Sequence, residues 1–118
     1  MSDKLTKVDI ITSKDRFEEL KKALDDIAGM TVTNVSGCGM QKGHKEYYRG
    51  LAMDINLIPK VKVEVVVCEV PVDLVVETAK KVLHTGEIGD GKIFVYNVEN
   101  VIRISTGDEG RAALQYKK

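Results

Sequence analysis

Apolar and polar residues alternate with two-residue spacing in four parts of the chain, a pattern typical of half-buried β-strands. The spacing predicts strands over 7–12, 30–36, 60–68 and 92–98. The third is the clearest, because valines at 61, 63, 65 and 67 share one face of the strand. A shorter β-branched run predicts a fifth strand over 101–105.

Two other segments repeat their apolar residues every three or four positions, as amphipathic helices do. The first follows Ser13, a good N-cap, and ends before Gly29. The second begins at Pro71, which suits a first helical turn, and its apolar stripe continues to Leu83. The last residues, 108–118, are expected to form a partly ordered tail.

This order of elements predicts a single α+β domain over 1–118, a ferredoxin-like βαββαβ sandwich. In that fold, a four-stranded antiparallel sheet carries two helices on one face. The other face, with Ile11 and Val66, has no helix to cover it. An uncovered apolar face on a small domain indicates self-association.

Charge and composition exclude several functional classes. The 118 residues carry 18 Lys and Arg against 18 Asp and Glu, and a neutral chain argues against direct nucleic-acid binding. No apolar run approaches the ~18 residues of a membrane span. With two cysteines and no apolar N-terminal leader in the sequence, we expect the reducing environment of the cytoplasm.

The turn before the last long strand carries the most specific chemistry. Residues 86–92 read Gly-Glu-Ile-Gly-Asp-Gly-Lys, the glycine and lysine spacing of a P-loop. A P-loop continues with Ser or Thr into a helix, whereas this segment continues with Ile93 into a predicted strand. Two interpretations remain, an anion-binding nest of glycine N–H groups assisted by Lys92, or a tight turn. Arg103, on the predicted strand 101–105, would lie near enough to serve the same anion.

A second unusual segment spans residues 39–57, which lack regular spacing. Stretches of about twenty residues without structure are uncommon in compact domains and are often functional. Gln41 and Lys42 either contact a ligand or are solvated. Tyr48 and Arg49 either anchor a partner or fold back on the chain. No set of His, Cys, Ser or carboxylate residues has metal-ligand or catalytic spacing, so the sequence disfavours an enzyme.

Three stretches resemble one known family. They are Gly29–Val35 (Gly-Met-Thr-Val-Thr-Asn-Val), Gly39–His44 together with Tyr48-Arg49-Gly50, and Thr85–Val95. Residues 101–107, Val-Ile-Arg-Ile-Ser-Thr-Gly, extend the match. The chain therefore resembles the PII nitrogen-regulatory signal-transduction proteins, in particular those of GlnK type.

The resemblance implies a homotrimer that binds ATP or ADP in the clefts between subunits and acts as a sensor rather than an enzyme. It implies that 2-oxoglutarate binds beside an Mg²⁺ ion held by ATP. Residues 39–57 would form the T-loop, the segment that contacts target proteins. The implied targets are an ammonium transporter and a nitrogen transcription regulator or glutamine synthetase. The protein would then be cytoplasmic and associate reversibly with the membrane through the transporter.

The resemblance also implies site residues by position. Those expected to contact the nucleotide are Ile11, Thr31, Gly37, Gly39, Gln41, Glu64, Val66, Gly89, Asp90, Gly91, Lys92 and Arg103. Gln41 would also ligate Mg²⁺, and Gln41, Lys42 and Lys60 would bind 2-oxoglutarate. Tyr48 and Arg49 would contact the partner protein.

Three positions depart from the family pattern. Met40 and Ser105 stand where arginines are common, and each loss removes a charged phosphate contact worth about 1.5–3 kcal/mol. Met53 replaces the tyrosine that is modified in the T-loop. These departures keep open a trimeric PII-like sensor of another nucleotide or anion. A metal-tolerance trimer on the same scaffold is a further alternative, which the missing His and Cys ligand set disfavours.

Overall fold

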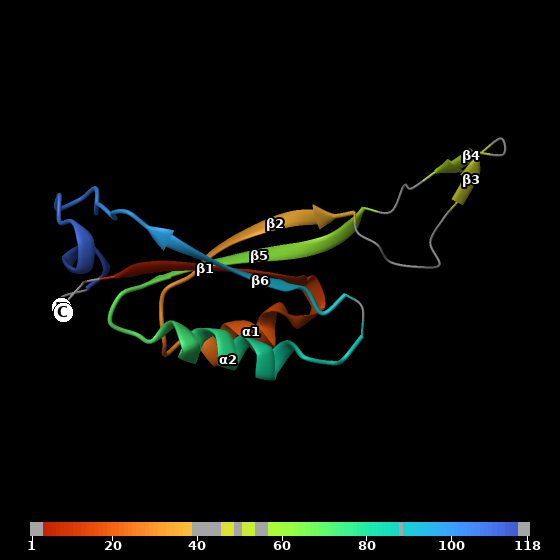
Figure 1. Ribbon diagram of the computed structural model, residues 1–118. Helices are drawn as coiled ribbons and strands as arrows, with labels where there is room; N and C mark the ends of the chain where they lie inside the picture. The colour runs from red at the N-terminus through yellow and green to blue at the C-terminus, as the bar shows by residue number, and fades with distance from the viewer. Residues whose placement is uncertain (1–3, 39–45, 49–50, 54–56, 88, 116–118) are drawn as a thin grey trace.

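The main sheet has four strands and two helices on one of its faces (Figure 1). The computed structural model describes residues 4–38, 46–48, 51–53, 57–87 and 89–115. The strands are β1 (Leu5–Ser13), β2 (Thr31–Gly37), β5 (Ile58–Val67) and β6 (Lys92–Val98). Their order is β2-β5-β1-β6, and every neighbouring pair is antiparallel. The predicted ferredoxin-like fold is therefore confirmed.

The helices bury the valine face of the sheet. They are α1 (Phe17–Leu24), preceded by the 3₁₀ helix η1 (Lys14–Arg16), and α2 (Val72–Leu83). The core joins apolar side chains of both layers, namely Val8, Ile10, Leu20, Leu24, Val61, Val63, Val65, Val67, Val75, Ala79 and Leu83. Burying one Val, Leu or Ile side chain stabilises a fold by about 1.5–3 kcal/mol. The alternation of residues 60–68 thus correctly predicts which face of β5 packs against the helices.

The first helix begins differently from the prediction. Ser13 has the extended backbone of an N-cap, but its side chain makes no capping hydrogen bond. The chain passes through a single 3₁₀ turn before the α-helix starts at Phe17.

The predicted strand 101–105 is wrong. The chain turns here, because the Gly107 N–H donates to the Arg103 carbonyl at 2.8 Å. Only an isolated bridge joins Ile102 to Glu109. The tail beyond 108 is also more ordered than predicted, since residues Gly110–Leu114 form the 3₁₀ helix η2 and bury Ala113.

Regular structure also occurs within the 39–57 segment, which was expected to have none. Strands β3 (Glu46–Tyr48) and β4 (Leu51–Met53) pair with each other as a two-stranded antiparallel sheet, separate from the main one (Figure 1). Apart from these strands and Leu57, the segment lies outside the described residues.

The face opposite the helices carries a charged cluster beside the apolar residues that were predicted there. Lys7 and Lys62 form ion pairs there with Asp9 and Glu64, at 3.3–3.8 Å. Asp9 is only 2% exposed, although no helix covers it. Apolar residues such as Ile11 and Val66 are half-buried beside this cluster. Within the described part of the chain, no helix is long and apolar enough to span a membrane.

Candidate functional site

Asp90 organises the turn between α2 and β6. Its carboxylate accepts hydrogen bonds from the Thr85 hydroxyl, from the Thr85 N–H at 2.8 Å and from the Gly86 N–H at 3.0 Å. The Thr85 hydroxyl, followed by these N–H groups, holds the pKa of Asp90 below its ordinary value of 3.8. Its backbone carbonyl accepts a bond from the Thr12 hydroxyl at 2.8 Å, which ties the turn to β1.

Two glycines give this turn its shape. Gly89 and Gly91 both have φ near +110°, a backbone conformation that side chains disfavour. A Cβ atom on Gly91 would lie 1.9 Å from the Ile11 carbonyl oxygen, so the turn approaches β1 too closely for any other residue. Successive backbone N–H groups in such glycine turns form concave anion-binding sites.

Basic side chains flank the turn. Lys60 of β5 donates from Nζ to the Gly89 carbonyl at 3.3 Å and also lies against Gly37, the last residue of β2. Lys92, which is exposed, starts β6 opposite Ile11 of β1. We call residues Gly89–Lys92 with Lys60 and Gly37 the glycine nest. It combines backbone donors with two cations, which suits a phosphate group.

A cavity of about 520 Å³ lies further along the sheet. Its walls include Thr31 and Glu64, which face each other across β2 and β5, together with Val66. Glu64 lies four residues from Lys60 on β5, a separation of about 13 Å along a strand. That separation is comparable with the length of an extended nucleoside triphosphate. The cavity and the glycine nest could therefore hold the two ends of one nucleotide.

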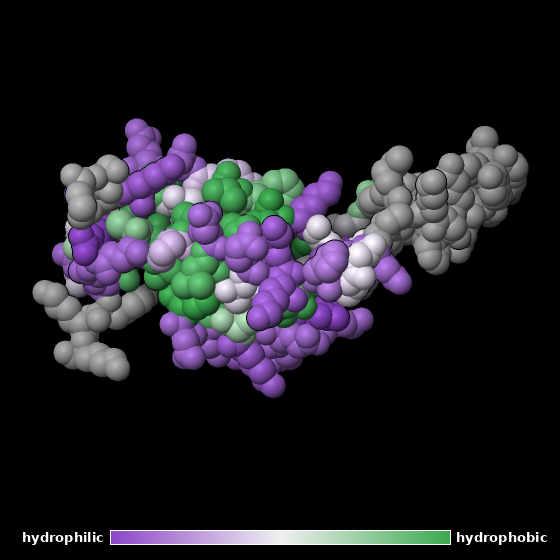
Figure 2. All heavy atoms as spheres, turned by 60° about the horizontal axis from the view of Figure 1, so that its bottom comes forward, coloured by the Kyte–Doolittle hydropathy of each residue, from purple (hydrophilic) through white to green (hydrophobic). Residues whose placement is uncertain are grey.

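A larger cavity of about 940 Å³ lies between α2 and β6. Its walls are mainly apolar and include Ala79, Leu83 and Val95. Figure 2 shows apolar side chains exposed on one side of the molecule and bordered by hydrophilic ones. Of the predicted site residues that the structure describes, only Asp90, Gly91 and Lys92 line this cavity, so we place the site at the glycine nest and the smaller cavity.

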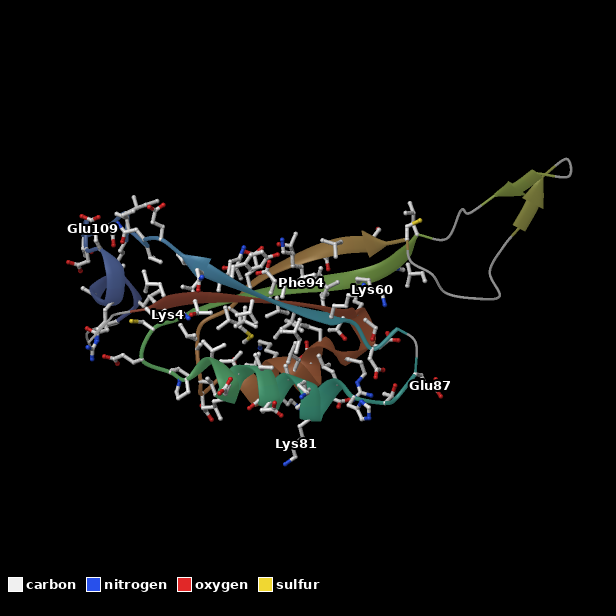
Figure 3. All side chains as sticks on the ribbon, viewed as in Figure 1. Lys4, Lys60, Lys81, Glu87, Phe94 and Glu109 are labelled. Atoms are coloured by element: carbon white, nitrogen blue, oxygen red, sulfur yellow. The ribbon has the colours of Figure 1, made fainter. Side chains whose placement is uncertain are left out.

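Arg103 is not near the glycine nest. Lys92 begins β6 and Arg103 follows its far end at Val98, so the length of the strand, about 20 Å, lies between them. Figure 3 shows Lys60 and Glu87 toward one end of the main sheet and Glu109 at the other, where Arg103 bonds to the adjacent Asp108. The Arg103 guanidinium instead donates to the carbonyls of Ala113, at 2.9 Å, and Gln115. The expectation that Arg103 serves the same anion within one chain is therefore wrong.

The glycine turn and the fold together point to a known family, and comparison with known proteins decides it. The family model described as nitrogen regulatory protein P-II matches residues 5–108. The chain belongs to the P-II family. It is 52% identical over 116 residues to the nitrogen regulatory PII-like protein of Bacillus subtilis, covering 97% of this chain and 100% of that protein. Identity to nitrogen regulatory protein P-II 1 of Escherichia coli is 47%, over 93% of this chain and all of that protein.

Solved structures of P-II proteins share the fold. A B. subtilis GlnK structure in complex with ATP has a TM-score of 0.79 and 48% identity, covering 97% of this chain and 99% of that one. An Arabidopsis thaliana PII structure bound to citrate has a TM-score of 0.75 and 37% identity, covering 95% and 94% of the two chains. The resemblance to GlnK-type P-II proteins that was inferred from the sequence is thus confirmed.

The structure brings some of the predicted P-II site residues together and does not describe others. Two groups of predicted residues come together. The group at the glycine nest consists of Gly37, Lys60, Gly89, Asp90, Gly91, Lys92 and Ile11, and the group at the smaller cavity consists of Thr31, Glu64 and Val66. Tyr48 ends β3, whereas Gly39, Gln41, Lys42 and Arg49 lie outside the described residues. In the part of the chain that is described, no group of three His, Cys, Asp or Glu residues could hold a metal ion.

Sequence reasoning missed two sets of contacts. Thr12 and Thr85 brace the glycine turn through hydroxyl groups, which no spacing rule in the sequence reveals. At the other end, Glu69 binds Arg111 and Gln115, residues that the sequence assigned to a partly ordered tail.

Proposed function

We propose that this chain is a homotrimeric nitrogen and energy sensor that binds ATP or ADP between its subunits and controls target proteins. The glycine nest is the observation that carries this proposal. It presents two glycines with positive φ and two lysines at one end of the main sheet. A cavity wide enough for a base opens about 13 Å away along β5. The ATP complex of the B. subtilis GlnK supports adenine nucleotides as the ligand class.

The position of Arg103 supports assembly between subunits. The length of β6, about 20 Å, lies between Lys92 and this residue in one chain, so its guanidinium would reach the phosphate site from a second copy. The neighbouring Ile102 and Ile104 are 56% and 99% exposed in the single chain, as interface residues would be. The trimeric state is part of the proposal, with each nucleotide held by the glycine nest of one subunit and Arg103 of the next.

A Mg²⁺ ion and 2-oxoglutarate complete the proposed site. Mg²⁺ usually keeps several waters and binds through substrate phosphates with few protein ligands, and Gln41 would be such a ligand. Lys42 and Lys60 would supply the positive charge that a dicarboxylate needs beside the phosphates. The citrate bound by the Arabidopsis PII supports a site for small carboxylate anions in this family.

The output of the sensor would pass through the 39–57 segment. Tyr48 and Arg49 are the proposed contacts to an ammonium transporter, because a long, permanently charged guanidinium can enter a narrow pore mouth and donate to carbonyls. A nitrogen transcription regulator or glutamine synthetase is a further proposed target. The protein would act in the cytoplasm and reach the membrane through the transporter.

Calorimetry tests the ligand class directly. Purified protein is titrated with ATP, ADP, AMP and cyclic AMP, each with and without Mg²⁺ and 2-oxoglutarate, while native mass spectrometry measures subunit number. We expect ATP and ADP to bind a trimer, and 2-oxoglutarate to bind only when Mg-ATP is present. Tight binding of AMP or cyclic AMP alone would favour the second candidate, a PII-like sensor of another nucleotide, which the absent arginines at Met40 and Ser105 support.

A pull-down from native membranes tests the partner. Wild-type protein with ADP should retain the ammonium transporter, and ATP with 2-oxoglutarate should release it. Arg49→Ala should fail to retain the transporter under both conditions, whereas an exposed α1 variant, Lys22→Ala, should behave as wild type. Equal recovery with Arg49→Ala would remove Arg49 from the transporter contact.

A further inference from the structure

One carboxylate holds the C-terminal segment against the body of the domain. Glu69, just after β5, forms an ion pair with Arg111 and accepts a hydrogen bond from the Gln115 side-chain amide at 2.9 Å. Both partners belong to residues 110–115, which we call the C-terminal clamp. The clamp lies beyond the 5–108 stretch that matches the P-II family model.

The clamp forms one wall of the smaller cavity. Arg111, Leu114 and Gln115 line it opposite Thr31 and Glu64, the residues proposed to contact the base and ribose. Ala113, at the centre of the clamp, is buried, so the segment is packed as well as tied. A nucleotide base entering this cavity would therefore meet clamp residues on one side.

The clamp also fixes Arg103. The Arg103 guanidinium donates to the carbonyls of Ala113 and Gln115, and it lies 3.7 Å from the Asp108 carboxylate. Its backbone N–H donates to the Asp108 carbonyl at 2.8 Å. The position of this arginine thus depends on the same clamp segment that supplies Arg111, Leu114 and Gln115 to the cavity wall.

We propose that Glu69 is a positioning residue for nucleotide binding, because it holds the C-terminal clamp closed over the base cavity and with it sets the place of Arg103. This inference rests on the proposed nucleotide site. Glu69 also lines this cavity, and exchanging its charge with that of Arg111 distinguishes its hold on the clamp from direct contact with a ligand. The Glu69 and Arg111 side chains are 49% and 45% exposed, so the pair can separate without uncovering the core. The clamp therefore opens more readily than the domain unfolds, and its opening frees the nucleotide.

The test compares dissociation rates of a fluorescent adenine nucleotide, mant-ADP, chased with excess ADP. Glu69→Ala should release mant-ADP up to about fivefold faster than wild type, the loss expected from a half-exposed ion pair. The exchanged pair Glu69→Arg with Arg111→Glu should restore most of the slow release. Glu77→Ala removes an exposed carboxylate that pairs with Lys80 on the same helix, and it serves as the matched control.

Hydrogen exchange gives a readout that does not need a ligand. In nucleotide-free protein, Glu69→Ala should raise exchange in residues 109–115 and leave β5 and α2 unchanged. The proposed role of Glu69 is wrong if Glu69→Ala releases mant-ADP at the wild-type rate, or if the exchanged pair releases it as fast as Glu69→Ala does. Either result leaves the proposed function standing. A wild-type protein that binds no mant-ADP overturns the proposed function, and the clamp's role in binding with it.

Discussion

The two ends of the sheet keep their shape by different means. At the glycine nest, the backbone itself is constrained, with φ near +110° at Gly89 and Gly91 and hydroxyl groups bracing the turn. At the C-terminal clamp, side chains from separate segments meet on the surface, and Glu69 and Arg111 are both about half exposed. Backbone constraints are insensitive to salt and intolerant of substitution, whereas exposed ion pairs are weak and screened. One end is therefore rigid and the other adjustable.

Replacing Gly91 should have the largest effect. Gly91→Ala places a Cβ atom against the Ile11 carbonyl and also forces an alanine to positive φ, so we expect a loss of at least about 3 kcal/mol in urea unfolding. Gly107→Ala has the positive φ without the collision and should lose about 1 kcal/mol. Gly29→Ala has neither and should be nearly neutral. Equal losses for Gly91 and Gly107 would contradict the close approach to β1.

Removing the charge of the nest should affect binding and spare stability. Lys92→Ala takes away an exposed ammonium that would face the phosphates, so affinity for ATP and ADP should fall about tenfold or more. Titration calorimetry measures the affinity and urea unfolding the stability, with Lys22→Ala as the control. If both variants bind ATP as tightly as wild type does, Lys92 does not hold phosphate.

The hydrogen bonds of the Asp90 carboxylate should contribute less to stability in acid. The pKa of Asp90 is lowered in the folded protein, so its contribution to stability is complete above pH 3.8 and is lost as the pH falls through the lower folded value. Wild type should exceed Asp90→Asn in stability at about pH 5. Below about pH 4 the difference should shrink as the carboxylate is protonated. A difference that grows in acid would show that the hydrogen bonds do not favour the charged form.

Breaking the clamp should change stability only slightly. Glu69→Ala breaks a half-exposed pair, so the free energy of unfolding should fall by less than about 1 kcal/mol. Raising the salt concentration to about 1 M should reduce this difference further, because mobile ions screen exposed charges. If Glu69→Ala lowers the free energy of unfolding as much as Gly91→Ala does, and independently of salt, then the two ends of the sheet do not differ in the way described.

The sheet and helices were predictable because their apolar spacing is local and strong, as in the valines of β5. The turn of the glycine nest at Gly89–Lys92 was predictable for the same reason, since its conformation is set by glycines that are close together in the sequence. The strand predicted at 101–105 failed because its β-branched residues pair with no neighbouring strand among the described residues and form only the isolated bridge from Ile102 to Glu109. Asp9 and the Glu69 contacts could not be predicted, because each depends on which distant strands and segments the fold places side by side.

The close approach of Gly91 to β1 also has an entropic consequence. Glycine loses more conformational freedom on folding than any other residue, and this turn orders Gly86, Gly89 and Gly91 together. That loss is complete once Asp90 and Thr12 have fixed the turn, before any anion arrives. Ordering a flexible loop at the moment of binding weakens affinity, and a turn already held in place avoids that cost. An anion would thus meet donors that are already aligned, and heat released on binding would be little offset by ordering of this turn.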